Sequence, residues 1–435
     1  MKRLICVALV ACGGSSPHST DAPADAASTP ATANADRDVT DTKLAFDVSA
    51  MTATATVTFA PSTTPGATLE VGDLVLNAVK IDGARIPFAQ HVTSVASTVD
   101  LGVPASDQPI AVEFDYAYKT HEQFQGASAG GYTFIWPFFC GNLFPCHSQP
   151  SDGTTFSSIA LTGVPAGKTA IVAPAITVDA PSYMFAWTID AYTELPLGTT
   201  TAGTHLSVWY RDGELADATT GTADSVAAFD WLEKNIGPYR FGDRAGSVSI
   251  GWPAGAYGGM EHHPFWHVSS RDLANKDTNV HESAHGWFGD GVRIACWEDF
   301  VLSEGTVSYL AAKSLEVVDA DAGAAAWASN QTQLAALHGN QPVWPQSCNQ
   351  IDILNDGLYS NAPYMRGAFF YRAVELKYGA QPVIDALHEF FMANQGKAAK
   401  MSDMITTLEA HTGDLTACVN TWLLSTTLPT PGPCP

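Results

Sequence analysis

The sequence predicts a multidomain α+β protein in which an all-β region precedes a mainly helical region. The chain has 435 residues, which is more than one hydrophobic core usually serves. Short strand-like runs, separated by Gly, Pro, Asn and Asp, continue to about residue 210, and apolar residues at helical spacing begin near residue 222. These patterns place the two predicted domains at residues 38–210 and 211–435.

The composition excludes several classes of protein. Hydrophobic residues make up 46% of the chain, which is enough for buried cores, and 36 Gly and 26 Pro are near ordinary levels. Disordered and collagen-like proteins are therefore excluded. With 44 acidic and 21 basic residues the formal charge is −23, which would repel a phosphate backbone. We therefore expect no nucleic-acid partner. No protein partner can be inferred from the sequence.

Residues 1–11 predict a signal peptide. Positive charges at residues 1–3 precede an apolar stretch at residues 5–11, and the ending Leu-Val-Ala-Cys resembles a bacterial lipobox, in which Cys12 becomes the lipidated first residue. Residues 12–37 are small and polar and predict a tether. We expect an exported lipoprotein of the cell envelope, at the outer membrane or periplasmic face. An ordinary secretory signal with an incidental Cys12 is the alternative, and it would give a secreted protein.

Six cysteines remain after the signal peptide and the anchor, and an even number fits disulfides in an oxidising compartment. We expect two local pairs, Cys140 with Cys146 and Cys418 with Cys434. A cysteine-rich metal site is disfavoured because no CxxC spacing occurs. The six are Cys140, Cys146, Cys296, Cys348, Cys418 and Cys434.

The β-region is predicted from runs such as Leu44–Val48, Ile110–Tyr116 and Ala170–Val178. Beyond it, Val226, Phe229 and Ile236 repeat at helical spacing, and Gly-Pro after Ile236 ends that helix. One strand, Ser247–Gly251, should follow. Further helices are expected at about residues 278–290, 303–318, 363–378, 381–394 and 401–412.

The predicted chemistry lies in the helical region, where His281-Glu282-Ser283-Ala284-His285 matches HExxH. Positions i and i+4 lie on one face of a helix, so both imidazoles can reach one zinc ion. Glu304 follows His285 after 18 residues, and two His plus one Glu is the ligand set of a catalytic zinc site. The alternatives are two packed or surface histidines, and a glutamate favoured near a helix start by the helix dipole.

Two further motifs flank this site, Tyr257-Gly258-Gly259-Met260-Glu261-His262 upstream and Pro363-Tyr364-Met365-Arg366-Gly367-Ala368 downstream. Together the four signals resemble the zinc aminopeptidases of the aminopeptidase N type, in the gluzincin family. The resemblance covers roughly residues 38–430, and it includes Phe144-Pro145-Cys146 and Trp422.

The resemblance implies an N-terminal antiparallel β-sandwich or saddle followed by a thermolysin-like, mainly helical catalytic domain. It implies one Zn²⁺ per chain, bound by His281, His285 and Glu304. Glu282 would be the general base that deprotonates the zinc-held water, and Tyr364 would stabilise the oxyanion. The substrate-binding residues would be Glu261, which holds the free α-amino group, with Gly258, Gly259 and Met260.

Several residues depart from the family pattern. His262 replaces Asn, Ser303 stands where Asn is frequent, and Arg366 replaces Lys. In the β-region, residues 147–149 are His-Ser-Gln where the family has Phe-Asp-Glu, which puts contacts to the substrate end in doubt. The resemblance is to a short form without the C-terminal helical domain.

Several histidine, aspartate and aromatic residues near the motifs are expected to have structural roles. A second metal at His262, His263 and His267 is disfavoured because no bridging carboxylate pair is evident. We expect His262 to shape the groove and the other two to be partly buried around a tryptophan. Asp299 either orients a zinc-ligating imidazole or caps a helix. Trp287 and Phe288 are predicted core residues.

The sequence thus predicts a zinc-dependent aminopeptidase that acts on peptides outside the cytoplasm and is held to a membrane through a lipidated Cys12. A zinc endopeptidase with an open cleft is one alternative. A non-catalytic peptide-binding surface lipoprotein is the other, and it is disfavoured because binding does not require Glu282 and Tyr364 together.

Overall fold

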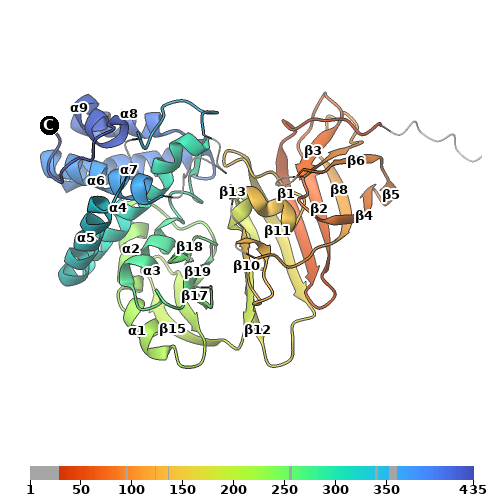
Figure 1. Ribbon diagram of the computed structural model, residues 1–435, viewed down its shortest axis with the longest axis horizontal. Helices are drawn as coiled ribbons and strands as arrows, with labels where there is room; N and C mark the ends of the chain where they lie inside the picture. The colour runs from red at the N-terminus through yellow and green to blue at the C-terminus, as the bar shows by residue number, and fades with distance from the viewer. Residues whose placement is uncertain are drawn as a thin grey trace, which may run out of the picture.

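A computed structural model describes residues 29–93, 97–122, 124–135, 137–253, 257–338, 341–351 and 360–435. The predicted signal peptide, Cys12 and most of the predicted tether lie outside these residues. A β-rich region comes first and a region with most of the helices follows it, as the colours of Figure 1 trace from orange to blue. The predicted α+β class, with the β-region first, is confirmed.

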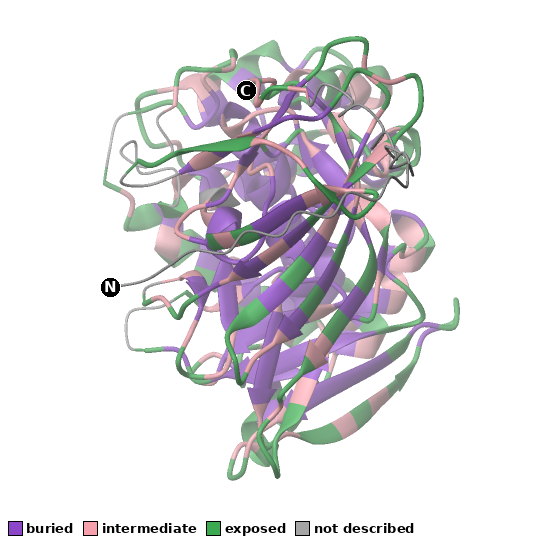
Figure 2. Ribbon diagram, turned by 90° about the vertical axis from the view of Figure 1, so that its right-hand side faces the viewer, coloured by how far each residue is buried: buried purple, intermediate pink, exposed green. Residues whose placement is uncertain are grey.

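The β-rich region is built on a seven-stranded sheet in the order β13-β11-β1-β2-β8-β4-β5, beside a three-stranded sheet β3-β7-β6. Buried and exposed side chains alternate along the long strands, which Figure 2 shows as bands of colour. This alternation is typical of a sheet with one face on a core and one face in water. Its strands are β1 (Val39–Asp47), β2 (Thr52–Phe59), β3 (Ala67–Glu70), β4 (Val75–Ile81), β5 (Ala84–Arg85), β6 (Phe88–His91), β7 (Thr98–Leu101), β8 (Ile110–Ala117), β9 (Gln125–Ala127), β10 (Thr133–Ile135), β11 (Gly153–Thr162), β12 (Thr169–Val172), β13 (Ile176–Pro181) and β14 (Trp187–Asp190).

The second region begins with a five-stranded sheet in the order β15-β16-β17-β19-β18. Its strands are β15 (Thr193–Thr199), β16 (His205–Tyr210), β17 (Arg244–Ile250), β18 (Gly259–Met260) and β19 (Phe265–Ser269). Strand β16 pairs with β17 in parallel, so one sheet crosses the domain boundary predicted at residue 210. This corrects the boundary: residues 193–210 group with the helical region. Because their sequence is typical of β-strands, we had predicted residues 193–210 to be part of the all-β domain.

The two faces of this sheet pack against different cores. Val208 and Trp266 join the helical core on one face, whereas Val248 and Ile250 join the core of the β-rich region on the other. Every residue of β17 after Arg244 is buried. The sheet is therefore the layer at which the two regions meet.

Helices cover the remaining side of the sheet and form the far end of the molecule (Figure 1). They are α1 (Leu215–Gly221), α2 (Ser225–Asn235), α3 (Lys276–Ala284), α4 (Phe300–Val318), α5 (Ala320–Ala335), α6 (Asn361–Tyr378), α7 (Ala380–Asn394), α8 (Met401–Thr412) and α9 (Thr416–Val419), with the short strands β20 (Arg293–Ile294) and β21 (Ala398–Ala399). Among the described residues, no helix combines the length and apolar character that crossing a bilayer requires.

The observed elements differ from the expected ones in several places. The predicted strand Ala170–Val178 is divided between β12 and β13. The helix predicted to reach residue 290 ends at Ala284, and the chain turns at Gly289, whose φ of 105° suits glycine. Helices α1, α5 and α9 and strand β19 were not predicted.

Three disulfides join the six cysteines. Cys140–Cys146 and Cys418–Cys434 are confirmed, and Cys296 pairs with Cys348.

Candidate active site

Helix α3 presents the two histidines of the HExxH motif. The helix begins after Asn275, whose side chain accepts hydrogen bonds from the backbone N–H groups of Asp277 and Thr278. Asn275 is therefore an N-cap that satisfies two otherwise unpaired donors. One helical turn separates His281 from His285, so both rings face the same cavity.

Glu304 reaches these histidines from α4. Its position depends on a close crossing of α4 and α6 at Gly305 and Gly367. A Cβ atom added to Gly367 would lie 2.5 Å from the Cα of Gly305, which is closer than packed atoms come. Two glycines at this crossing thus let the two helices approach each other beside Glu304.

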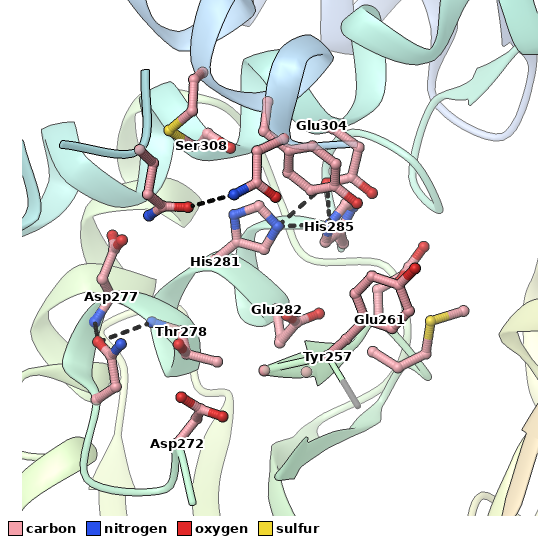
Figure 3. A pocket seen from close by; sticks show the side chains of 18 of the residues that line it. Tyr257, Glu261, Asp272, Asp277, Thr278, His281, Glu282, His285, Glu304 and Ser308 are labelled. Atoms are coloured by element: carbon pink, nitrogen blue, oxygen red, sulfur yellow. Dashed lines mark hydrogen bonds and ion pairs between the residues drawn. The ribbon is translucent and has the colours of Figure 1, made fainter. Parts of the chain in front are cut away.

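The three predicted ligand atoms form a nearly equilateral triangle (Figure 3). His281 Nε2 lies 3.2 Å from Glu304 Oε2, His285 Nε2 lies 3.4 Å from the same oxygen, and the two Nε2 atoms are 3.3 Å apart. A tetrahedral zinc site with bonds of about 2.0–2.1 Å has ligand atoms about 3.3–3.4 Å apart. The residues present therefore fit a zinc ion with one open position.

The electrostatics of this cluster also fit a cation. Burial by itself would raise the pKa of Glu304, but the charge of His285 and hydrogen bonds to both histidines lower it. The same carboxylate raises the pKa of His281 and His285 in spite of their burial. A bound metal ion replaces the protons on such ligands, so its affinity should increase with pH.

The ring of His285 is fixed by its other nitrogen. Nδ1 lies 3.0 Å from the carbonyl oxygen of Phe288 and donates a hydrogen bond to it. In this tautomer Nε2 has no proton, and its lone pair is directed toward the cavity. Metal-ligating histidines commonly have such a second hydrogen bond. Gly289 makes room for this ring, because a Cβ atom there would lie 2.6 Å from Nδ1.

Glu282 lies beside the triangle and is buried. Burial is the main cause that raises the pKa of its carboxyl group to about 8, and a metal dication nearby would favour the ionised form. A Cβ atom on Gly259 would lie 2.3 Å from Glu282 Oε1, so a larger residue there would displace the Glu282 carboxyl group. His263 bridges the Tyr239 hydroxyl, 2.8 Å away, and the Glu282 carbonyl, 2.9 Å away. Sequence reasoning had assigned His263 only to packing.

Tyr364 lies on α6 and lines the same cavity. Its ring stacks on the ring of His281 with a centroid distance of 6.0 Å, and it meets Phe300 edge to face at 5.9 Å. Arg366, two residues further on, donates to the backbone carbonyls of Trp422, Gln341 and Ser425. These bonds hold the start of α6 against the C-terminal segment.

Glu261 follows β18 at the edge of the five-stranded sheet. Its carboxylate lies within 4.8 Å of ligand atoms of Glu282 and His285. Burial raises the pKa of Glu261, and the charge of His285 partly offsets this rise. Strand β18 is an edge strand among the described residues, so its backbone can pair with an extended peptide.

All the predicted site residues line one cavity of about 330 Å³. The β-rich region contributes Phe134 and Tyr183 to its wall, and the sequence had not singled out either residue. No local pattern marks them, because only the packing of the two regions brings them here. Trp297 and Phe300 also line the cavity, as do Asp272 and Asp277.

Asp299 and His262 have roles that differ from the expected ones. Asp299 accepts hydrogen bonds from Trp344 Nε1 at 3.2 Å and, at 3.0 Å, from the backbone N–H group of Met401, the first residue of α8, and its side chain does not cap α4. It therefore connects structural elements and does not orient an imidazole. His262 is absent from the cavity lining and packs against His267, with ring centroids 4.7 Å apart. The predicted core positions of Trp287 and Phe288 are confirmed.

Comparison with known proteins supports this site. Residues 260–422 match the Peptidase family M1 domain. Leucine aminopeptidase 2 of Aspergillus niger is 29% identical over 196 residues, or 43% of this chain and 31% of that protein. Leucine aminopeptidase 2 of Emericella nidulans is 25% identical over 293 residues, or 61% of this chain and 46% of that protein. The chain thus spans less than half the length of these relatives.

Solved structures share the fold. The M1 zinc metallopeptidase from Deinococcus radiodurans superposes with a TM-score of 0.76 at 21% identity, covering 91% of this chain and 96% of that one. Yeast LTA4 hydrolase in complex with bestatin gives a TM-score of 0.74 at 19% identity, covering 91% and 69%. The predicted resemblance to zinc aminopeptidases of this type is therefore confirmed.

Proposed function

We propose that the chain whose residues 260–422 match the Peptidase family M1 domain is a zinc aminopeptidase, which removes N-terminal residues from peptides. One observation carries this proposal. The triangle of His281, His285 and Glu304 fits zinc, and it shares one cavity with a buried base, Glu282, and a buried anchor for an amine, Glu261.

Zinc bound by His281, His285 and Glu304 would supply a Lewis acid that activates water and polarises the scissile carbonyl. Glu282 accepts the proton of the attacking water and delivers it to the leaving amine nitrogen. The hydroxyl group of Tyr364 donates a hydrogen bond to the oxyanion that develops on the carbonyl oxygen. Glu261 binds the α-ammonium group of the substrate and fixes which peptide bond is cut.

The position of Glu261 distinguishes an aminopeptidase from an endopeptidase. The test is the hydrolysis of aminoacyl amides and peptides, each with a free or an acetylated N-terminus. We expect only the free forms to be good substrates. Glu261→Ala should lower kcat/KM for them roughly 10- to 150-fold, the loss of a charge-assisted contact of about 1.5–3 kcal/mol.

Two outcomes would contradict the proposal. Internal cleavage of acetylated peptides at comparable rates, with Glu261→Ala neutral, would identify an endopeptidase. A zinc-loaded chain that binds peptides without cutting any of them would identify a binding protein.

One zinc ion per chain is part of this proposal, because three protein ligands and one open position make a single tetrahedral site. Elemental analysis should give about one zinc per chain. Chelation should abolish activity, and added zinc should restore it. Glu304→Ala should lose both the metal and the activity.

We also propose that the enzyme acts outside the cytoplasm, attached to a membrane through a lipidated Cys12. Support comes from the sequence pattern of residues 1–12 and from three disulfides, which form in oxidising compartments. Mass spectrometry of the mature N-terminus tests this. An acylated Cys12 that Cys12→Ala abolishes is the expected result, and an unmodified start elsewhere would reject the anchor.

A further inference from the structure

Two carboxylates in the cavity have no role in the proposed mechanism. Asp272 and Asp277 line the same cavity as the zinc triangle. No lysine or arginine belongs to that lining, and neither carboxylate forms an ion pair within the described part of the chain. The cavity therefore has two carboxyl groups beyond those of its zinc ligand, base and amine anchor.

Asp272 lies near the residue that precedes β18, whereas Glu261 directly follows β18. Its carboxyl carbon is 3.8 Å from where a Cβ atom on Gly258 would stand, whereas Glu282 approaches Gly259. Gly258 comes directly before β18 and Glu261 directly after it, so the two residues flank this short strand. Asp272, Glu282 and Glu261 therefore follow one another along the groove.

Helix α3 gives the same order. Asp277 precedes His281 by one helical turn, and His285, at the other end, is the histidine nearest Glu261. Figure 3 shows Asp272 and Asp277 on one side of Glu282 and Glu261 on the other. A peptide with its amine at Glu261 and its first peptide bond at Glu282 would have its second residue on the side of these two aspartates.

Asp277 has an unpartnered atom at this end. Its Oδ1 is buried and has no hydrogen-bond partner among the described residues. The adjacent Lys276 does not neutralise it, because its ammonium group pairs with Asp224 and, at 3.1 Å, with Asp319. An acidic residue in the first turn is favourable for a helix, but that preference does not explain Asp272, which lies outside the helix.

We propose that Asp272 and Asp277 form a subsite for a basic side chain on the second residue of the substrate, directly after the cleaved bond. The inference rests on the proposed aminopeptidase function and names its substrate class, peptides with Lys or Arg at position two. Glu261 and this subsite together would recognise two positive charges on opposite sides of the cleaved bond.

The test compares the tripeptides Leu-Lys-Ala, Leu-Met-Ala and Leu-Glu-Ala by the rate of leucine release. Lysine and methionine have similar lengths, so the first pair isolates the charge. We expect kcat/KM to decrease from Lys to Met to Glu, with about a tenfold or larger ratio between Lys and Glu. Leucine amide has no second residue and measures the aminopeptidase activity by itself.

Substitutions at Asp272 and Asp277 test whether these residues cause the preference for lysine at position two. Asp272→Asn and Asp277→Asn should each reduce the Lys-to-Glu ratio, and the double variant should bring it to about one. Asp272→Lys should reverse the preference toward glutamate, a gain that misfolding cannot produce. Asp321→Asn, which removes an exposed charge on α5 outside the cavity, should keep the full wild-type ratio.

The outcomes separate this inference from the function on which it rests. Hydrolysis of leucine amide with equal rates for the Lys and Glu peptides would overturn the subsite and leave the aminopeptidase proposal intact. No hydrolysis of leucine amide or of any of the tripeptides by the zinc-loaded chain would overturn both.

Discussion

The β-rich region and the helical region use buried positions differently. Strand β2 alternates buried and exposed residues, and its buried side chains are apolar. Helix α4 is buried along almost its whole length and includes polar residues, among them Glu304 and Thr306. Thr306 bonds to the Tyr371 hydroxyl at 2.8 Å, whereas Glu304 faces the cavity. Packing explains the buried residues of β2, whereas the burial of Glu304 in α4 is explained by its place in the cavity.

The largest expected effect is a loss of activity without a loss of structure, when the buried residue Glu282 is replaced. Glu282→Gln removes the proposed proton acceptor and keeps His281, His285 and Glu304, the three residues that fit zinc. We expect kcat to fall about 10²- to 10⁴-fold with zinc content unchanged, measured by peptide hydrolysis and elemental analysis. Glu389→Gln, at an exposed position on α7, is the control and should change neither. Retained activity in Glu282→Gln would mean that another group accepts the proton.

A core substitution in the β-rich region should have the opposite profile. Phe156 is fully buried, and its ring stacks on Phe185 at 5.6 Å and meets Phe144 edge to face at 5.7 Å. Phe156→Ala should cost about 3–5 kcal/mol of stability, seen as a lower Tm, with kcat unchanged below the transition. A large decrease in kcat for the folded variant would show that the core of the β-rich region also affects the chemistry of the site.

Gly367 should link stability and activity, because it lies where α4 and α6 cross beside the site. Gly367→Ala places a methyl group against the backbone of Gly305 and against Val301. We expect a loss of about 1–3 kcal/mol together with reduced kcat, since the helices that carry Glu304 and Tyr364 must separate. Gly432→Ala, where nothing lies within 4 Å, should be silent in both measurements.

The smallest expected effect is a pH dependence that originates in the β-rich region. His147 bonds through Nδ1 to Asp152 and through Nε2, at 2.7 Å, to the Thr68 carbonyl. Burial by itself would lower the pKa of His147, but the hydrogen bond and charge of Asp152 raise it overall. This stabilisation is complete below the unfolded pKa of about 6.5 and is lost as pH rises through the higher folded pKa.

Wild-type Tm should therefore decrease as pH increases above about 6.5, and His147→Gln should flatten that part of the profile. Thermal unfolding at several pH values measures both. An identical slope in the variant would assign the dependence to other groups.

The sequence predicted those features whose signal is local in the chain. Helices α7 and α8 have apolar residues on one face, and α6 begins with the motif that contains Tyr364, but α5 is rich in alanine and lacks a clear apolar stripe. The zinc triangle was predictable because its residues lie between positions 281 and 304. Phe134 and Tyr183 were not, because they reach the cavity only when two regions pack together. Asp272 and Asp277 carry no motif, and their place follows from the turn after β19 and from the start of α3.

The two faces of the five-stranded sheet pack against different cores, and this limits which fragments of the chain can be expressed as folded protein. A fragment that begins near residue 193 would keep the complete zinc triangle, but it would expose Trp209, Val248 and Ile250 to water. An exposed apolar face of this kind promotes self-association. It would also lose the wall that Phe134 and Tyr183 provide. The β-rich region thus shields this apolar face from water, and expression of the second region by itself should give aggregated protein.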